Sequence, residues 1–200
     1  MTFLAGAGAV ALLELDAASV GPFLLSRPFV IAPLAGWALG DPWAGAALGA
    51  AFEALTLEEM PLGGCLDFSA PVAAGVAAVV AATNRALPWE AAFTAGLAAG
   101  WAHAFLEGRL RRVRGAHVGR LEKALAAGRT PRYGAEIAGA LLAQAAATFG
   151  LAAALISAGP ALARLWPSVP EFLRAGARAA FLSAPWIGGG SLAMSLWRRA

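Results

Sequence analysis

Charged side chains are scarce in this chain of 200 residues. Asp, Glu, Lys and Arg together make up 14% of it, and hydrophobic residues make up 60%. Soluble domains carry about 25% charged residues, so the deficit predicts an integral membrane protein. The alternative is a soluble, alanine-rich helical bundle. It is disfavoured because several long windows have almost no charge, whereas a soluble helix keeps one polar face.

Reactive groups are also few. Cys65 is the one cysteine, so an internal disulfide is excluded, and no nearby Cys or His suggests a metal site. No nucleotide-binding loop G-x-x-x-x-G-K-[ST] and no G-x-S-x-G nucleophile motif occurs. We therefore expect no catalytic residue, cofactor or metal in this chain. The first 13 residues have no basic segment, so we expect no cleaved signal peptide.

Only two histidines are present, His103 and His117. His117 lies in a basic segment and is interpreted as a solvated residue. His103 could carry a proton or a phosphoryl group. We interpret it instead as an interfacial bystander, because it is a single histidine close to one end of an apolar segment.

Basic residues gather in one segment, residues 109–132, and the net charge is +3. Under the positive-inside rule this segment is predicted to be a cytoplasmic loop, with a short surface helix that touches anionic lipid or a partner as the alternative, and Arg198-Arg199 predicts a cytoplasmic C-terminus. The charge therefore indicates topology and contact with membrane lipid rather than nucleic-acid binding. Against one acid, Glu122, the segment holds Arg109, Arg111, Arg112, Arg114, Arg120, Lys123, Arg129 and Arg132.

The chain reads as one membrane domain over residues 1–200, an all-α multi-span bundle. Residues 1–85 form its first half, beginning with a short or tilted helix that continues to Val20. Residues 86–108 predict a further span, and residues 133–200 predict the C-terminal spans. Pro185 and the glycines at 188–190 kink and loosen the last of these.

Two features predict contacts between helices. Gln144 and Thr148 are four residues apart and share one helix face, which could hydrogen-bond to another helix. Small residues recur at spacing four and predict tight packing, because small side chains let two backbones approach closely. The pairs are Gly36/Gly40, Gly45/Gly49 and Gly96/Gly100.

The most informative stretch runs from Asp16 to Pro71. It carries six acids separated by glycine-rich apolar pieces that are too short to cross a bilayer: Asp16, Asp41, Glu53, Glu58, Glu59 and Asp67. Ionisable residues within apolar membrane segments are costly unless they face protein, water or ligand. Short segments broken by Gly and Pro are typical of a transporter's midplane site. The stretch is therefore our candidate functional site.

Residues 28–57 predict a re-entrant helical hairpin, with two half-length helices joined at Gly40-Asp41-Pro42. Such a turn is tolerated at membrane depth only where it is buried in protein or faces water. The alternative is two short, tilted spans. Residues 58–67 predict a loop or an unwound segment.

The acids have competing interpretations. Glu53 could bind a ligand or pair with an arginine such as Arg27. Asp41 could bind a ligand or cap a helix, and Asp67 likewise could cap the following helix. Glu58 could be a solvated loop residue.

This stretch resembles the IIC subunit of the mannose/fructose/sorbose-type sugar phosphotransferase systems. The resemblance covers about residues 14–83. Elsewhere it is limited to hydropathy and the glycines at 188–190. It rests on Asp16, Arg27-Pro28, Gly40-Asp41, Gly45/Gly49 with Glu53, and Gly63-Gly64. Two positions depart from the family pattern: Leu57-Glu58 stands where Leu-Gly is usual, and Asp67-Phe68 where Pro-Asp is frequent.

The resemblance implies a bacterial inner-membrane subunit that binds and passes a hexose-like sugar. It would work with a IID membrane subunit, while soluble IIA and IIB subunits carry the phosphate on histidines. This chain would take no phosphate itself and would be part of an oligomer. The predicted sugar-binding residues are Glu53, Asp41, Asp67, Arg27 and Glu58, with Arg27 orienting the hairpin by pairing with an acid.

Two other functions stay open. Because the chain is short for this family, it could be a truncated, non-transporting scaffold that docks soluble phosphocarriers through residues 109–132. It could also be a small unrelated membrane channel.

Overall fold

The computed structural model describes residues 2–16, 24–57 and 68–198. Every regular element in these ranges is a helix, which confirms the predicted all-α class. The helices are α1 (Thr2–Leu15), α2 (Pro28–Ala38), α3 (Pro42–Leu55), α4 (Ala70–Thr83), α5 (Trp89–Ala126), α6 (Tyr133–Ser157), α7 (Gly159–Leu165), the 3-10 helix η2 (Trp166–Ser168) and α8 (Glu171–Trp197).

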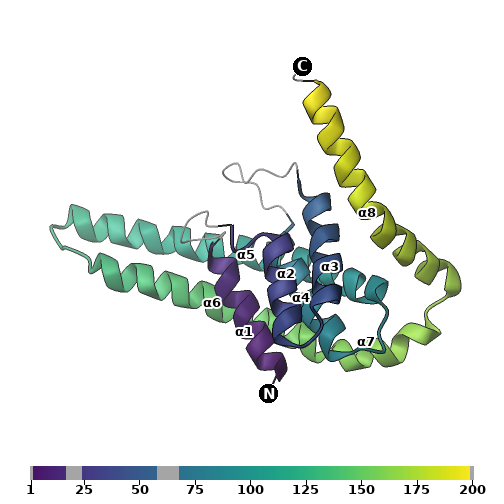
Figure 1. The fold of residues 1–200 in the computed structure, drawn as a ribbon. Helices are drawn as coiled ribbons and strands as arrows, with labels where there is room; N and C mark the ends of the chain where they lie inside the picture. The colour runs from purple at the N-terminus through teal and green to yellow at the C-terminus, as the bar shows by residue number, and fades with distance from the viewer. Residues whose placement is uncertain (1, 17–23, 58–67, 199–200) are drawn as a thin grey trace.

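Helix α4 is the centre of the fold. It contacts α1, α2, α3, α5 and α6, and it buries every residue from Val72 to Ala82. Its sequence is almost entirely Ala, Val and Gly, so it has no polar face to expose and suits a position surrounded by other helices. We refer to α1–α4 with the first half of α5 as the body (Figure 1).

The helices α1 to α4 are short. With 11 to 14 residues each, they measure roughly 17–21 Å, less than the ~30 Å hydrocarbon core. Within the described part of the chain, two helical stretches are long and apolar enough to cross a membrane, Tyr133–Ser168 and Glu171–Trp197.

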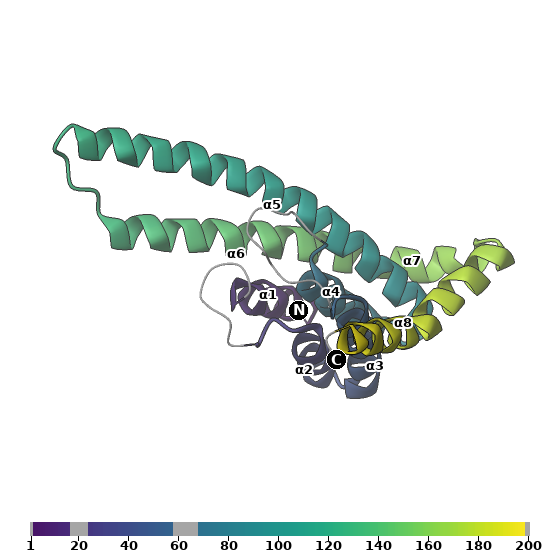
Figure 2. The same cartoon turned by 90° about the horizontal axis from the view of Figure 1, so that it is seen from above.

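A long hairpin of α5 and α6 leaves the body on one side (Figures 1 and 2). We call its projecting part, residues 105–143, the arm. The sequence predicted a span at 86–108 followed by a loop at 109–132. The structure instead continues α5 as one helix of 38 residues to Ala126. Arg, Lys, Leu and Ala are all good helix formers, and Glu107 pairs with Arg111 one turn later. The basic segment is therefore mostly helical.

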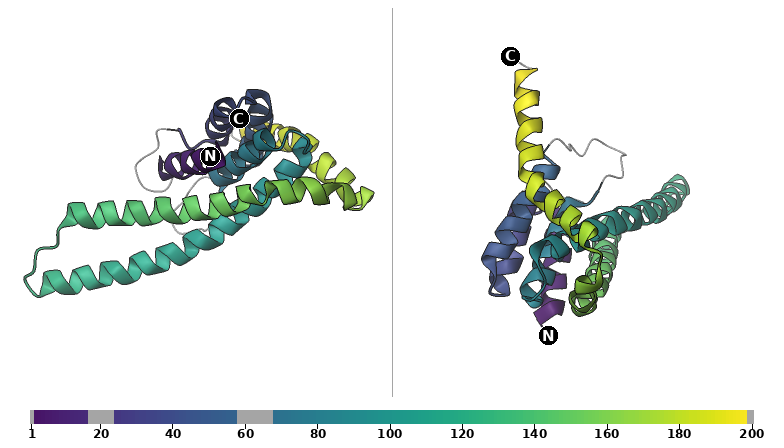
Figure 3. Two further views of the ribbon diagram at one scale, coloured as in Figure 1. Left: turned by 90° about the horizontal axis from the view of Figure 1, so that it is seen from below. Right: turned by 90° about the vertical axis from the view of Figure 1, so that its right-hand side faces the viewer.

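Helix α8 departs in another direction and rises past the body (Figure 3). It begins at Glu171 and contains Pro185 within the helix. Its contacts with the body are made to α3 and α5. Gly188 is the closest point: a Cβ there would lie 2.3 Å from the carbonyl oxygen of Ala54.

Candidate functional site

The α2–α3 hairpin is held together by its glycines. A Cβ on Gly45 would lie 2.3 Å from the carbonyl oxygen of Ala32, and one on Gly49 would lie 2.6 Å from that of Pro28. A Cβ on Gly36 would lie 3.1 Å from Cα of Gly45. The two backbones thus approach as closely as the small-residue spacing predicted. Gly40 has another role, since its φ of +81° allows the turn.

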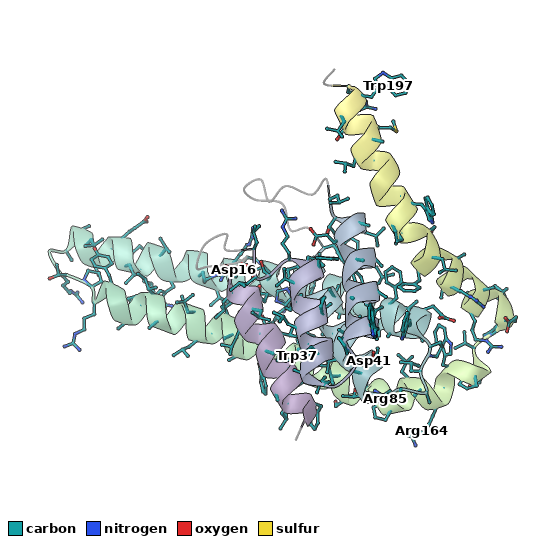
Figure 4. All side chains as sticks on the ribbon, in the orientation of Figure 1. Asp16, Trp37, Asp41, Arg85, Arg164 and Trp197 are labelled. Atoms are coloured by element: carbon teal, nitrogen blue, oxygen red, sulfur yellow. The ribbon has the colours of Figure 1, made fainter. Side chains whose placement is uncertain are left out.

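Polar groups at the turn of this hairpin are satisfied within the protein. Asp41 caps α3, with its Oδ1 accepting from the N–H of Ala44 at 3.1 Å. Its own N–H donates to the carbonyl of Gly36 at 2.8 Å. Arg85, from the α4–α5 connection, donates to the carbonyl of Gly40 at 3.2 Å. Figure 4 shows Asp41 and Arg85 close together at one end of the body.

The opposite end of the hairpin carries Glu53. Its Oε1 lies 3.3 Å from Nη1 of Arg27, and its Oε2 accepts from the N–H of Phe29 at 3.3 Å. Phe29 is in the first turn of α2, so the carboxylate satisfies an otherwise unpaired helix N–H and lies at the positive end of the helix dipole. The Arg27 side chain is 49% exposed and that of Glu53 is 21% exposed. Arg27 therefore pairs with an acid, as predicted. This pairing is also the alternative to ligand binding given above for Glu53, and the pair is accessible from outside.

Asp16 supports the same end of the body. Its Oδ2 accepts from both the N–H and the hydroxyl of Ser26, at 3.2 and 3.3 Å. Asp16 and Ser26 are both buried. Because Ser26 directly precedes Arg27, this contact fixes the start of α2. The acid upstream of Arg-Pro thus has a positioning role.

The structure does not bring all the predicted site residues together. Asp41 and Glu53 stand at the two ends of α3, and twelve residues of helix separate them by roughly 18 Å. One sugar cannot contact both carboxylates, and the capping interpretation of Asp41 is the one seen. Glu58 and Asp67 lie outside the described residues.

Two features near Glu53 escaped the sequence analysis. Helix α8 crosses the end of α3 with Gly188 against Ala54, the residue after Glu53. Beneath it the ring of Phe52 packs against those of Phe93 and Phe68, with centroids 4.8 and 6.2 Å apart. These contacts join segments far apart in the sequence. The glycines at 188–190 are the local sequence feature that allows a close helix contact in this part of the chain.

A second polar centre lies where α1 meets α5 and α6. Gln144 donates to the Glu14 carboxylate and the Thr148 hydroxyl is hydrogen-bonded to it, which confirms the predicted polar face. The interpretation of His103 as an interfacial bystander is wrong. His103 is 2% exposed and hydrogen-bonds Thr148 at 3.0 Å. No local pattern in the sequence indicates Glu14, because its partner Gln144 is 130 residues away.

Comparisons with known proteins agree with this architecture. A solved structure described as "Structure of membrane protein" aligns with 98% of this chain and 78% of its own, with a TM-score of 0.75 and 19% sequence identity. At that identity the likeness shows a shared fold. No curated protein sequence matches the chain. The family model "PTS system sorbose-specific IIC component" matches residues 4–199, far beyond the stretch 14–83 on which the resemblance was based. The chain therefore belongs to the sorbose-specific IIC component family of the phosphotransferase system, whose members are membrane subunits in sugar transport.

Proposed function

We propose that this chain translocates a hexose-like sugar, which binds beside Glu53. The exposed Arg27–Glu53 pair carries this proposal. An ionised carboxylate can accept several hydrogen bonds at once, as adjacent sugar hydroxyls require, and a guanidinium offers donors in a fixed fork. The pair stands where α2 begins, α3 ends and α8 crosses. Segments from three parts of the chain therefore meet at the proposed sugar site.

The hairpin of α2 and α3 is proposed to be re-entrant. Both helices are too short to span, and the polar groups at the turn are satisfied by Asp41 and Arg85. Satisfied polar groups are one requirement for a turn at membrane depth, and the turn itself, where Gly40 and Pro42 are exposed, would also have to face water or a partner subunit. The indole rings of Trp37 and Trp43 next to the turn are 72% and 79% exposed. They favour the other arrangement, two short spans whose turn reaches an interface, because tryptophan is enriched there.

Topology follows from charge in this proposal. The arm carries the basic residues of segment 109–132 and would lie on the cytoplasmic side, as would the C-terminus. There the arm would be within reach of soluble IIA and IIB phosphocarriers, while a IID-type subunit would be the membrane partner. The exposed helical arm also favours the second candidate, a scaffold that holds phosphocarriers without transporting.

Purification of the chain from its native membrane in mild detergent tests the partners. We expect a IID-like membrane protein to copurify, together with soluble phosphocarriers. Arg112 and Arg120 are exposed basic residues of the arm. The double variant Arg112→Gln/Arg120→Gln should lose soluble partners and keep the membrane partner, because only the former depend on these charges. A chain that purifies alone, or with soluble regulators only, would contradict the transporting function and favour the scaffold.

A further inference from the structure

The buried polar cluster of Glu14, His103, Gln144 and Thr148 has no part in the proposed sugar site. The side chains of Glu14 and His103 are 5% and 3% exposed, and Oε1 of Glu14 lies 3.8 Å from Nε2 of His103. Burying an ionised carboxylate in a protein interior is costly unless charge or hydrogen bonds compensate it. Two titratable groups buried side by side are therefore candidates for sharing a proton.

Hydrogen bonds fix the orientation of the Gln144 side-chain amide in this cluster. Nη1 of Arg114 donates to Oε1 of Gln144 at 3.1 Å. Because a guanidinium has no acceptor, Oε1 must face it, and Nε2 then donates to both carboxylate oxygens of Glu14 at 3.3 and 3.4 Å. Gln144 is therefore a hydrogen-bond donor to the Glu14 carboxylate. The hydrogen bond between Glu14 and the His103 side of the cluster is made through Thr148.

The Thr148 hydroxyl connects the two titratable groups. Its Oγ1 lies 3.3 Å from Oε2 of Glu14 and 3.0 Å from Nε2 of His103. A hydroxyl has one proton, so it can donate to only one of them, and the other must donate to it. Either His103 holds a proton on Nε2 and Glu14 is ionised, or Glu14 holds a proton on Oε2 and Nε2 of His103 accepts.

We propose that Glu14, Thr148 and His103 form a proton-binding site, in which the bound proton passes between His103 and Glu14 through the Thr148 hydroxyl. In that step the Nε2–H bond breaks as Oγ1 gains the proton, and Oγ1 gives its own proton to Oε2. Imidazolium and carboxylate become imidazole, protonated on Nδ1, and carboxylic acid. The net charge of the site is unchanged.

The charged groups on α5 near the cluster are two arginines and one acid. Arg111 and Arg114 both bind Glu107, and Arg114 also donates to Gln144. On α1, Asp16 lies near the cluster in sequence and binds Ser26. Helix α6 contributes only the neutral Gln144 and Thr148 here, and the described α2 and α4, which also pack on α1, contain no titratable residue. The charge of Glu14 is therefore offset in part by Arg114, through Gln144, and a bound proton would neutralise it within the cluster.

Glu107 is the acid of the arm that lies next to the cluster. It lies one helical turn beyond His103 on α5, and among the described residues its Oε2 is buried without a hydrogen-bond partner. The proposed proton-binding site lies where the arm joins the body. Binding or release of the proton therefore changes the charge at this junction.

Infrared difference spectroscopy of the purified chain tests the proposal. The spectra are recorded during a titration between about pH 5 and 8, the range in which histidine side chains change charge. We expect a carboxylic-acid C=O band that rises on acidification and is lost in Glu14→Gln. In Thr148→Val, which keeps both titratable groups, the band should shift in frequency and its midpoint should move.

Glu136→Gln is the matched control. It alters the half-exposed His117–Glu136 pair on the arm and should leave the band intact. A band that persists in Glu14→Gln would overturn the site, as would the absence of a titrating band in the native chain. A band identical in Thr148→Val and the native chain would overturn the passage of the proton through Thr148. This comparison tests that passage even if Glu14→Gln fails to fold.

Discussion

Sugar uptake through this chain is expected to fall about ten- to hundred-fold when Glu53 is replaced by Gln. The amide keeps the size of the side chain but loses the charge, and a hydrogen bond to a charged group contributes about 1.5–3 kcal/mol. Because Arg27 is half exposed and stays solvated without its partner, the amount of protein in the membrane should not change. The measurement is uptake of labelled hexose by cells that express the chain with its partner subunits.

Asp41→Asn is the matched control for this variant. Asn caps helices about as well as Asp, so the hydrogen bond to Ala44 can be kept and uptake should stay near the native rate. Equal uptake by Glu53→Gln and the native chain would remove Glu53 from the sugar site.

Gly45→Ala is expected to give the largest loss of stability in the body. The new Cβ would meet the Ala32 carbonyl at 2.3 Å and Cα of Pro33 at 3.0 Å. Both are backbone atoms, so the two helices must move apart. Overpacking of this kind costs about 1–3 kcal/mol, occasionally more. The same displacement moves Glu53 relative to Arg27, so the variant should lose sugar binding as well.

Thermal unfolding in detergent measures this effect. The matched control is Gly139→Ala on α6, where a Cβ meets nothing within 4 Å. It should be neutral or stabilising by up to about 1 kcal/mol, because alanine favours the helix more than glycine does. If Gly45→Ala unfolds at the same temperature as Gly139→Ala, the close contact between the α2 and α3 backbones described here is contradicted.

Local signals predicted the parts of this structure that depend on spacing. The glycines of α2 and α3 lie at close backbone approaches, and α2 begins at Pro28, the first residue of the predicted hairpin. Gln144 and Thr148 share a polar face that bonds to another helix. Each prediction needed only the period of a helix and the size or polarity of a side chain.

Contacts between distant segments could not be predicted in this way. Nothing near Glu14 in the sequence indicates that Gln144 will donate to it, and nothing near Glu53 indicates that α8 will pack beside it. The continuation of α5 through the basic segment was missed for another reason. Charge was interpreted as a sign of a loop or of a separate short surface helix, although a helix leaving the membrane can carry the same arginines.

The chain itself is proposed to bind a sugar at the Arg27–Glu53 pair. Thermal unfolding of the chain, purified with its membrane partner, tests it most directly when a panel of hexoses is added. A sugar at 100 times its dissociation constant should stabilise the native chain by about 2.7 kcal/mol, and Glu53→Gln at the same concentration should gain much less. If no sugar raises the unfolding temperature, or if Glu53→Gln is protected as well as the native chain, the proposed site is contradicted.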